Sequence, residues 1–98
     1  MRDYELVVIV SPQVEEERLG SVVEKVSSWI TNRGGTIGKV DQAPPWGRRR
    51  LAYPIKDFRE GTYVVMQAKM EPSVVDELES SLRISEDVLR YLLVRSDS

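Results

Sequence analysis

The stretch from Tyr4 to Val10 reads Tyr-Glu-Leu-Val-Val-Ile-Val and gives the clearest strand signal in the chain. It is rich in β-branched residues, too short for a typical helix, and apolar on both faces over its second half. These features predict a central strand of a sheet.

A helix is predicted directly after this strand. Ser11 is a cap-type residue, Pro12 suits the first turn of a helix, and acidic residues follow. Gly34-Gly35 suit the end of the helix. We therefore expect a helix over residues 13–32, whose apolar stripe at three- and four-residue spacing includes a core tryptophan: Leu19, Val22, Val23, Val26, Trp29 and Ile30.

Two extended stretches follow the helix, at residues 36–40 and 49–55, and a break at Pro44-Pro45 separates them. Because proline cannot donate to a central hydrogen-bond ladder, Pro54 predicts an edge strand. A turn is expected over residues 56–61.

The last part of the chain is predicted to form a strand, a helix and a strand. Residues 62–70 are β-rich, Ser73 and Asp76 have the spacing of a capping box, and residues 88–95 are largely apolar. The order β-α-β-β-α-β predicts an α+β, ferredoxin-like fold, in which a four-stranded antiparallel sheet carries two helices on one face. Residues 1–98 show no linker or repeat, so we expect a single domain.

The composition is that of a folded protein with few routes to catalysis. Of the 98 residues, 41% are hydrophobic and 31% are charged. The chain has no cysteine and no histidine, which excludes disulfides, cysteine or histidine zinc sites, thiol nucleophiles and imidazole bases. No run approaches the ~20 apolar residues of a membrane helix, and the beginning lacks the apolar stretch of a signal peptide, so a cytosolic location is expected.

The formal net charge of −2 argues weakly against nucleic-acid binding, but the charges are polarised along the chain. Acidic residues crowd the predicted first helix, whereas a basic stretch begins at Trp46. Its core, Trp46-Gly47-Arg48-Arg49-Arg50, places an aromatic ring beside guanidinium groups, a combination suited to stacking on bases and pairing with phosphates. An exposed hairpin with solubilising charges that discourage edge pairing explains it equally well.

A second basic and aromatic patch is expected where the first and last strands are neighbours. Arg2 and Tyr4 begin the first of these strands, and Arg90 and Tyr91 lie in the other. For Tyr91 we favour simple packing, with its hydroxyl reaching water. Glycines 34, 35 and 38 follow a helix rather than open one, so they indicate helix termination and not a phosphate-binding loop.

Three segments together resemble one family. They are Met1-Arg2-Asp3-Tyr4-Glu5, then Trp46-Gly47-Arg48-Arg49-Arg50-Leu51-Ala52-Tyr53-Pro54-Ile55, and Arg83-Ile84 leading to Val88-Leu89-Arg90. The chain resembles bacterial small-subunit ribosomal protein six over nearly its whole length, with a longer loop at Pro44-Pro45.

The resemblance implies a non-catalytic protein of the cytoplasmic small ribosomal subunit, without a cofactor or a metal. It implies binding to the central domain of 16S ribosomal RNA as a heterodimer with small-subunit protein eighteen. Carried over by position, the expected RNA contacts are Arg2, Tyr4, Lys56 and Arg90. The segment Trp46, Gly47, Arg48, Arg49 and Arg50 is expected to contact RNA, protein eighteen or both. A basic partner would also make the acidic net charge tolerable, and binding would then be cooperative.

Two alternatives share this fold. One is an independent single-stranded RNA binder that uses the open face of the sheet, and the other is a ligand-sensing or oligomerisation module. A binder of the first kind needs stacking rings on the first and third strands, where only Tyr4 and Tyr63 are available. A ligand sensor does not need three consecutive arginines beside an exposed tryptophan.

Overall fold

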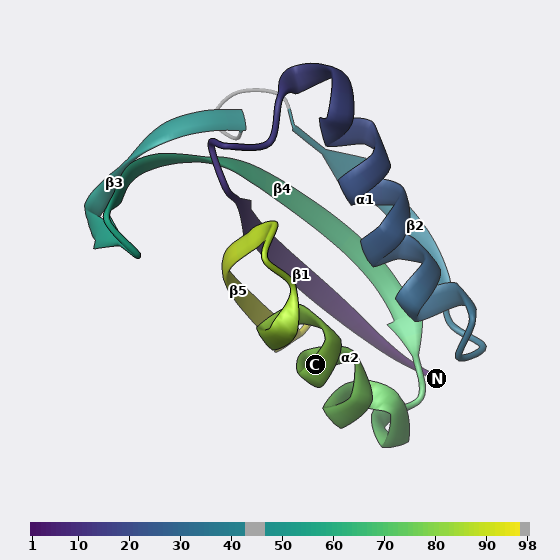
Figure 1. The fold of residues 1–98 in the computed structure, drawn as a ribbon. Helices are drawn as coiled ribbons and strands as arrows, with labels where there is room; N and C mark the ends of the chain where they lie inside the picture. Colours follow the sequence, from purple (N-terminus) through teal and green to yellow (C-terminus); the bar gives the residue numbers. More distant parts are fainter. Residues whose placement is uncertain (43–46, 97–98) are drawn as a thin grey trace.

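The computed structural model describes residues 1–42 and 47–96. Figure 1 shows the ribbon, with elements in the following order: β1 (Arg2–Val10), α1 (Glu16–Thr31), β2 (Thr36–Asp41), β3 (Gly47–Ile55), β4 (Phe58–Met70), the 3-10 turn η1 (Pro72–Val74), α2 (Val75–Ile84) and β5 (Val88–Arg95). Neither α1 nor α2 is long and apolar enough to cross a membrane.

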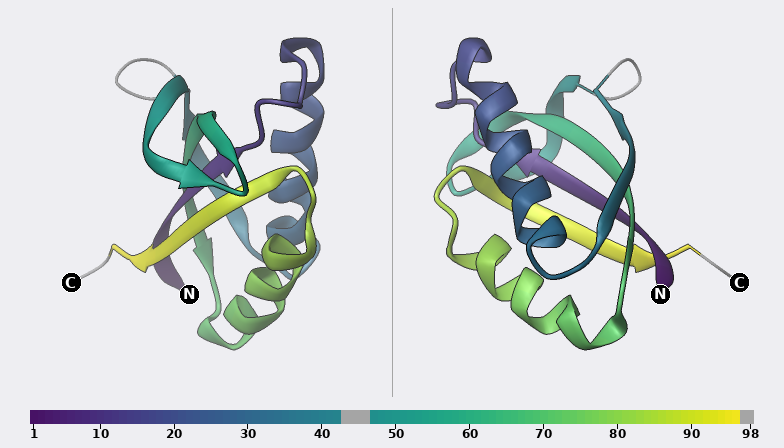
Figure 2. Two further views of the ribbon diagram at one scale, coloured as in Figure 1. Left: turned by 60° about the vertical axis from the view of Figure 1, so that its left-hand side comes forward. Right: turned by 90° about the vertical axis from the view of Figure 1, so that its right-hand side faces the viewer.

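The strands form one antiparallel sheet in the order β2-β4-β1-β5, and β3 also pairs with β4. Both helices cover the same face of this sheet (Figure 2). The predicted ferredoxin-like α+β fold is confirmed, although the sheet has five strands. The fifth arises because β4, with 13 residues, is long enough to pair with β3 along its first half and with β2 along its second.

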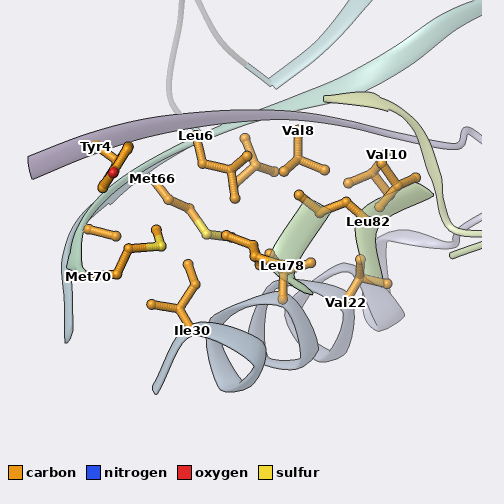
Figure 3. Packing of buried hydrophobic residues seen from close by; sticks show 14 of the residues in the cluster. Tyr4, Leu6, Val8, Val10, Val22, Ile30, Met66, Met70, Leu78 and Leu82 are labelled. Carbon is orange, nitrogen blue, oxygen red and sulfur yellow. The ribbon is translucent and has the colours of Figure 1, made fainter. Parts of the chain in front are cut away.

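The main core lies between the sheet and the helices. Every second residue of β1 points toward α1, beginning at Tyr4 and Leu6, and side chains of both helices meet them (Figure 3). Leu6, Ile30 and Leu82 are at most 1% exposed. Burial of a large aliphatic side chain is worth about 1.5–3 kcal/mol, so this layer supplies the main stabilisation of the fold.

Trp29 was predicted to be a core residue, but it is only half-buried at the margin of the core. There Lys25 Nζ lies 5.8 Å from the centroid of its ring.

The helix ends differ in detail from the sequence prediction. Pro12 lies in a turn before α1, where the Ser11 hydroxyl accepts a hydrogen bond from the Gln13 backbone N–H at 3.2 Å. The capping box predicted at Ser73 and Asp76 does not form. Pro72 opens a 3-10 turn instead, which moves the N-cap of α2 to Val74, without a side-chain cap.

The open face of the sheet carries a second, smaller core. Ile9, Leu51 and Leu89 are buried together there, and Ile55, Phe58 and Tyr63 pack around them. This cluster attaches the β3–β4 hairpin to the face that the helices leave uncovered (Figure 2). Among the described residues β3 pairs only with β4, in agreement with the edge strand predicted from Pro54.

Candidate nucleic-acid interface

The basic and aromatic patch expected where β1 and β5 are neighbours does not form as a single patch. The strands are neighbours, but they are antiparallel, so Ile9 lies opposite Arg90 and Tyr4 lies opposite Arg95. Arg2 begins β1 and lies opposite Met70 of β4. At 3.4 Å per residue, the backbone positions of Arg2 and Ile9 are roughly 24 Å apart. The prediction that Arg2 and Arg90 lie close together is therefore wrong.

The tyrosines of these strands are mainly packing residues. Tyr4 is 8% exposed and belongs to the main core, where little of its ring remains for stacking on a base. Tyr91 is half-buried against the same core, and its hydroxyl accepts a hydrogen bond from Arg83 Nη1 at 3.1 Å. The packing expected for Tyr91 is thus found, with its hydroxyl at the surface.

A groove of about 280 Å³ brings basic side chains together from three elements. Lys56 comes from the turn between β3 and β4, Arg83 from the last turn of α2, and Arg90 from β5. The remaining lining residues are Tyr91 and the apolar residues Leu82, Val88 and Leu89. Three cations beside apolar side chains form a site that favours an anion, and Glu79 Oε2, 3.6 Å from Arg83 Nη1, offsets only part of this positive charge.

Lys56 reaches the groove because the hairpin turns sharply. Lys56 and Asp57 both have positive φ, at 49° and 70°, and Ile55 pairs directly with Phe58. A two-residue turn of this kind matches the twist of the flanking strands, but it usually contains asparagine or glycine. The small core then places the turn beside the beginning of β5.

Arg90 is held in place by the same hairpin. Its Nη1 donates a hydrogen bond to the Tyr53 hydroxyl, and its Cζ lies 5.7 Å from the centroid of the Tyr53 ring. Tyr53 itself is 57% exposed. The guanidinium group is therefore oriented by an aromatic side chain of β3 before any ligand binds.

Arg83 was not among the site residues predicted from the sequence. It lies in the last turn of a helix, a position where a cation is also expected simply to complement the helix dipole. Its place in the segment Arg83-Ile84, which contributed to the family resemblance, was the available signal. Only the packing of α2 beside β5 shows that it shares a groove with Lys56 and Arg90.

The run of three arginines is divided by the alternation of β3. Arg48 Nη1 forms an ion pair with Glu60 Oε1 at 2.7 Å, whereas Arg49 lies over Tyr63, with its Cζ 5.2 Å from the ring centroid. Arg50 is exposed, and Gly47 has a φ of 91°. Trp46, which was predicted to be exposed, lies outside the described residues, as does Pro44-Pro45.

The open face also presents apolar side chains near the free edge of β5. Leu92 is 59% exposed and Val94 is 42% exposed. They alternate with residues that pack toward the helices, and they lie opposite Val7 and Glu5 of β1. The two side chains form a small exposed apolar row that a protein partner could cover. Within residues 1–42 and 47–96, no group of three or more acidic side chains is placed to hold a metal ion.

Known proteins match this chain over nearly its whole length. The family model described as ribosomal protein S6 matches residues 3–95. Small ribosomal subunit protein bS6 of Moorella thermoacetica is 46% identical over 95 residues, which cover 97% of this chain and 94% of the relative. The protein of the same name from Heliobacterium modesticaldum is 45% identical over 97 residues, which cover 99% of this chain and 98% of the relative.

A solved structure agrees with these sequence matches. The crystal structure of 30S ribosomal protein S6 from Thermotoga maritima superposes with a TM-score of 0.88 at 35% identity, covering 97% of this chain and 87% of that one. The fold, the arrangement of the elements and the sequence all lead to the same family. The chain belongs to the ribosomal protein S6 family.

Proposed function

We propose that this protein is a non-catalytic constituent of the cytoplasmic small ribosomal subunit, which binds the central domain of 16S ribosomal RNA together with small-subunit protein eighteen. Membership of the ribosomal protein S6 family supports the subunit assignment. The observation that carries the RNA contact is the groove in which Lys56, Arg83 and Arg90 converge. Cations from three elements around one groove suit the phosphates of a folded RNA backbone.

Two of the groove residues, Lys56 and Arg90, are RNA contacts expected from the family resemblance, and Arg83 extends the set. Arg2 is retained as a separate contact at the other end of β1. The Tyr4 ring is not retained as a stacking platform because the core buries it.

The partner surface is proposed on the open face and the adjoining hairpin. Leu92 and Val94 supply exposed apolar area, and Glu5 beside them supplies a carboxylate for a basic partner. The hairpin residues Trp46 to Arg50 are retained as contacts to RNA, to protein eighteen or to both. Partner binding on this face would place a second source of positive charge next to the RNA.

The alternative of an independent single-stranded RNA binder on the open sheet face is less well supported. Such a binder needs exposed rings on the central strands. Tyr4 points toward the helices, and Tyr63 is half-buried in the small core beneath Arg49. Exposed aliphatic side chains favour a protein partner there instead.

The proposal is tested by titrating a 16S central-domain RNA fragment with protein eighteen and single alanine variants at several salt concentrations. Replacing Lys56, Arg83 or Arg90 should weaken assembly and reduce the slope of log affinity against log salt by about one unit for each lost phosphate contact. Lys39→Ala, which removes an exposed charge from β2 at the far edge of the sheet, is the matched control and should change neither quantity. Three groove variants that behave like Lys39→Ala would refute the assignment of this groove to RNA.

A further inference from the structure

Tyr53 is an aromatic residue that the small core does not bury. It lies on the same strand as Leu51 and Ile55, but 57% of it is exposed, and it contacts Arg90 of β5. Its ring and its hydroxyl both engage one guanidinium group from a strand 37 residues further along the chain. This side chain therefore links the hairpin to the cationic groove.

The contact leaves most of the guanidinium group available. An arginine has five N–H donors in a planar fork, and Tyr53 accepts a hydrogen bond from Nη1 and lies against the group with its ring. The other donors remain for a ligand in the groove that Arg90 lines with Lys56 and Arg83. A long side chain that is already oriented loses less conformational freedom when it binds a phosphate.

We propose that Tyr53 is a positioning residue, which holds Arg90 in the orientation that binds an RNA phosphate. This inference rests on the proposed function and adds Tyr53 to it, as a residue that acts on RNA binding only through Arg90. It also gives the hairpin a role in the groove besides carrying Lys56, because the docking of β3 supplies the ring that orients Arg90.

The test is a double-mutant cycle with the full chain, protein eighteen and the 16S central-domain RNA fragment. Tyr53→Leu should weaken RNA assembly about two- to fivefold, the size of an exposed cation–π contact. Tyr53→Phe keeps the ring and should lose less. In the Arg90→Ala background, Tyr53→Leu should cause no further loss, whereas in the Lys39→Ala background it should keep its full effect. Urea unfolding of each variant shows whether the fold is retained.

Each alternative outcome has a distinct meaning. If Tyr53→Leu weakens binding equally with and without Arg90, the ring contacts RNA directly and the positioning role is wrong. If Arg90→Ala weakens binding but Tyr53→Leu does not, the positioning role is wrong while the proposed function stands. If Arg90→Ala itself has no effect, both the RNA contact at Arg90 and the role of Tyr53 are overturned.

Discussion

Gly35 illustrates how tightly single residues are packed where α1 ends. A Cβ atom at this position would lie 2.6 Å from Ile30 Cγ2 and 2.8 Å from the Lys69 carbonyl oxygen of β4. The backbone N–H of Gly35 also donates to the Ile30 carbonyl at 3.0 Å, which closes the end of the helix. Glycine is required here because any side chain would displace the backbone of β4.

Two glycine substitutions should therefore change stability in opposite directions. Gly35→Ala should lower the free energy of unfolding by about 1–3 kcal/mol, because the added methyl group overpacks the site. Gly20→Ala lies inside α1 with nothing within 4 Å of the new atom, and it should raise stability by about 0.5–1 kcal/mol. Equilibrium urea unfolding of both variants measures the two changes. Equal effects would contradict the packing at Gly35.

At the scale of an element, the β3–β4 hairpin depends on its own small core. Leu51 is 8% exposed and is buried with Ile9 and Leu89 on the open face. The positive φ values at Lys56 and Asp57 disfavour the turn slightly, so side-chain packing has to hold the hairpin in position. The position of Lys56 in the turn thus depends on the packing of Leu51 in the small core.

Leu51→Ala should loosen this attachment. We expect a loss of about 2 kcal/mol of stability, at the low end for a buried leucine because the cluster is small. Once the hairpin is loosened, Lys56→Ala should weaken RNA assembly less than it does in the wild-type chain. Val26→Ala, in the main core, is the control: it should lower stability but leave the effect of Lys56→Ala unchanged. An undiminished Lys56 effect in the Leu51→Ala chain would show that the small core does not position the turn.

At the scale of the whole molecule, the helices cover one face of the sheet (Figure 2), and exposed apolar side chains of β5 lie on the other face. Leu92 lies near the middle of β5 and is 59% exposed. Its neighbour across the strands is Val7, which is half-buried. A partner that covers this row would remove both side chains from water.

Leu92→Glu should consequently lower the affinity for protein eighteen by at least about tenfold, because a buried interface would have to accept an unpaired carboxylate. Isothermal titration calorimetry of the two proteins measures this affinity directly. The same change at Ile84, which is 83% exposed at the end of α2, should have little effect on it. If Ile84→Glu were the damaging variant, the partner would bind the helical side.

The sequence predicted the elements better than the site. Periodicity identifies the strands and helices because the alternation of β1 and the stripe of α1 follow directly from backbone geometry. Five extended stretches are visible in the sequence, but the pairing of two of them with one strand was not predictable, because it depends on the length of β4. The groove was not predictable either, because Lys56, Arg83 and Arg90 meet only through a turn with positive φ and the packing of α2.

The antiparallel register of β1 and β5 limits which RNA can touch both ends of the molecule. Arg90 lies opposite Ile9, whereas Arg2 lies at the other end of β1. Because roughly 24 Å separates the backbone positions of Arg2 and Ile9, Arg2 and Arg90 cannot bind adjacent phosphates of one RNA strand. Under the proposed function the two arginines would contact phosphates in two separate segments of the folded RNA. The protein would then hold these two segments at a fixed distance from each other.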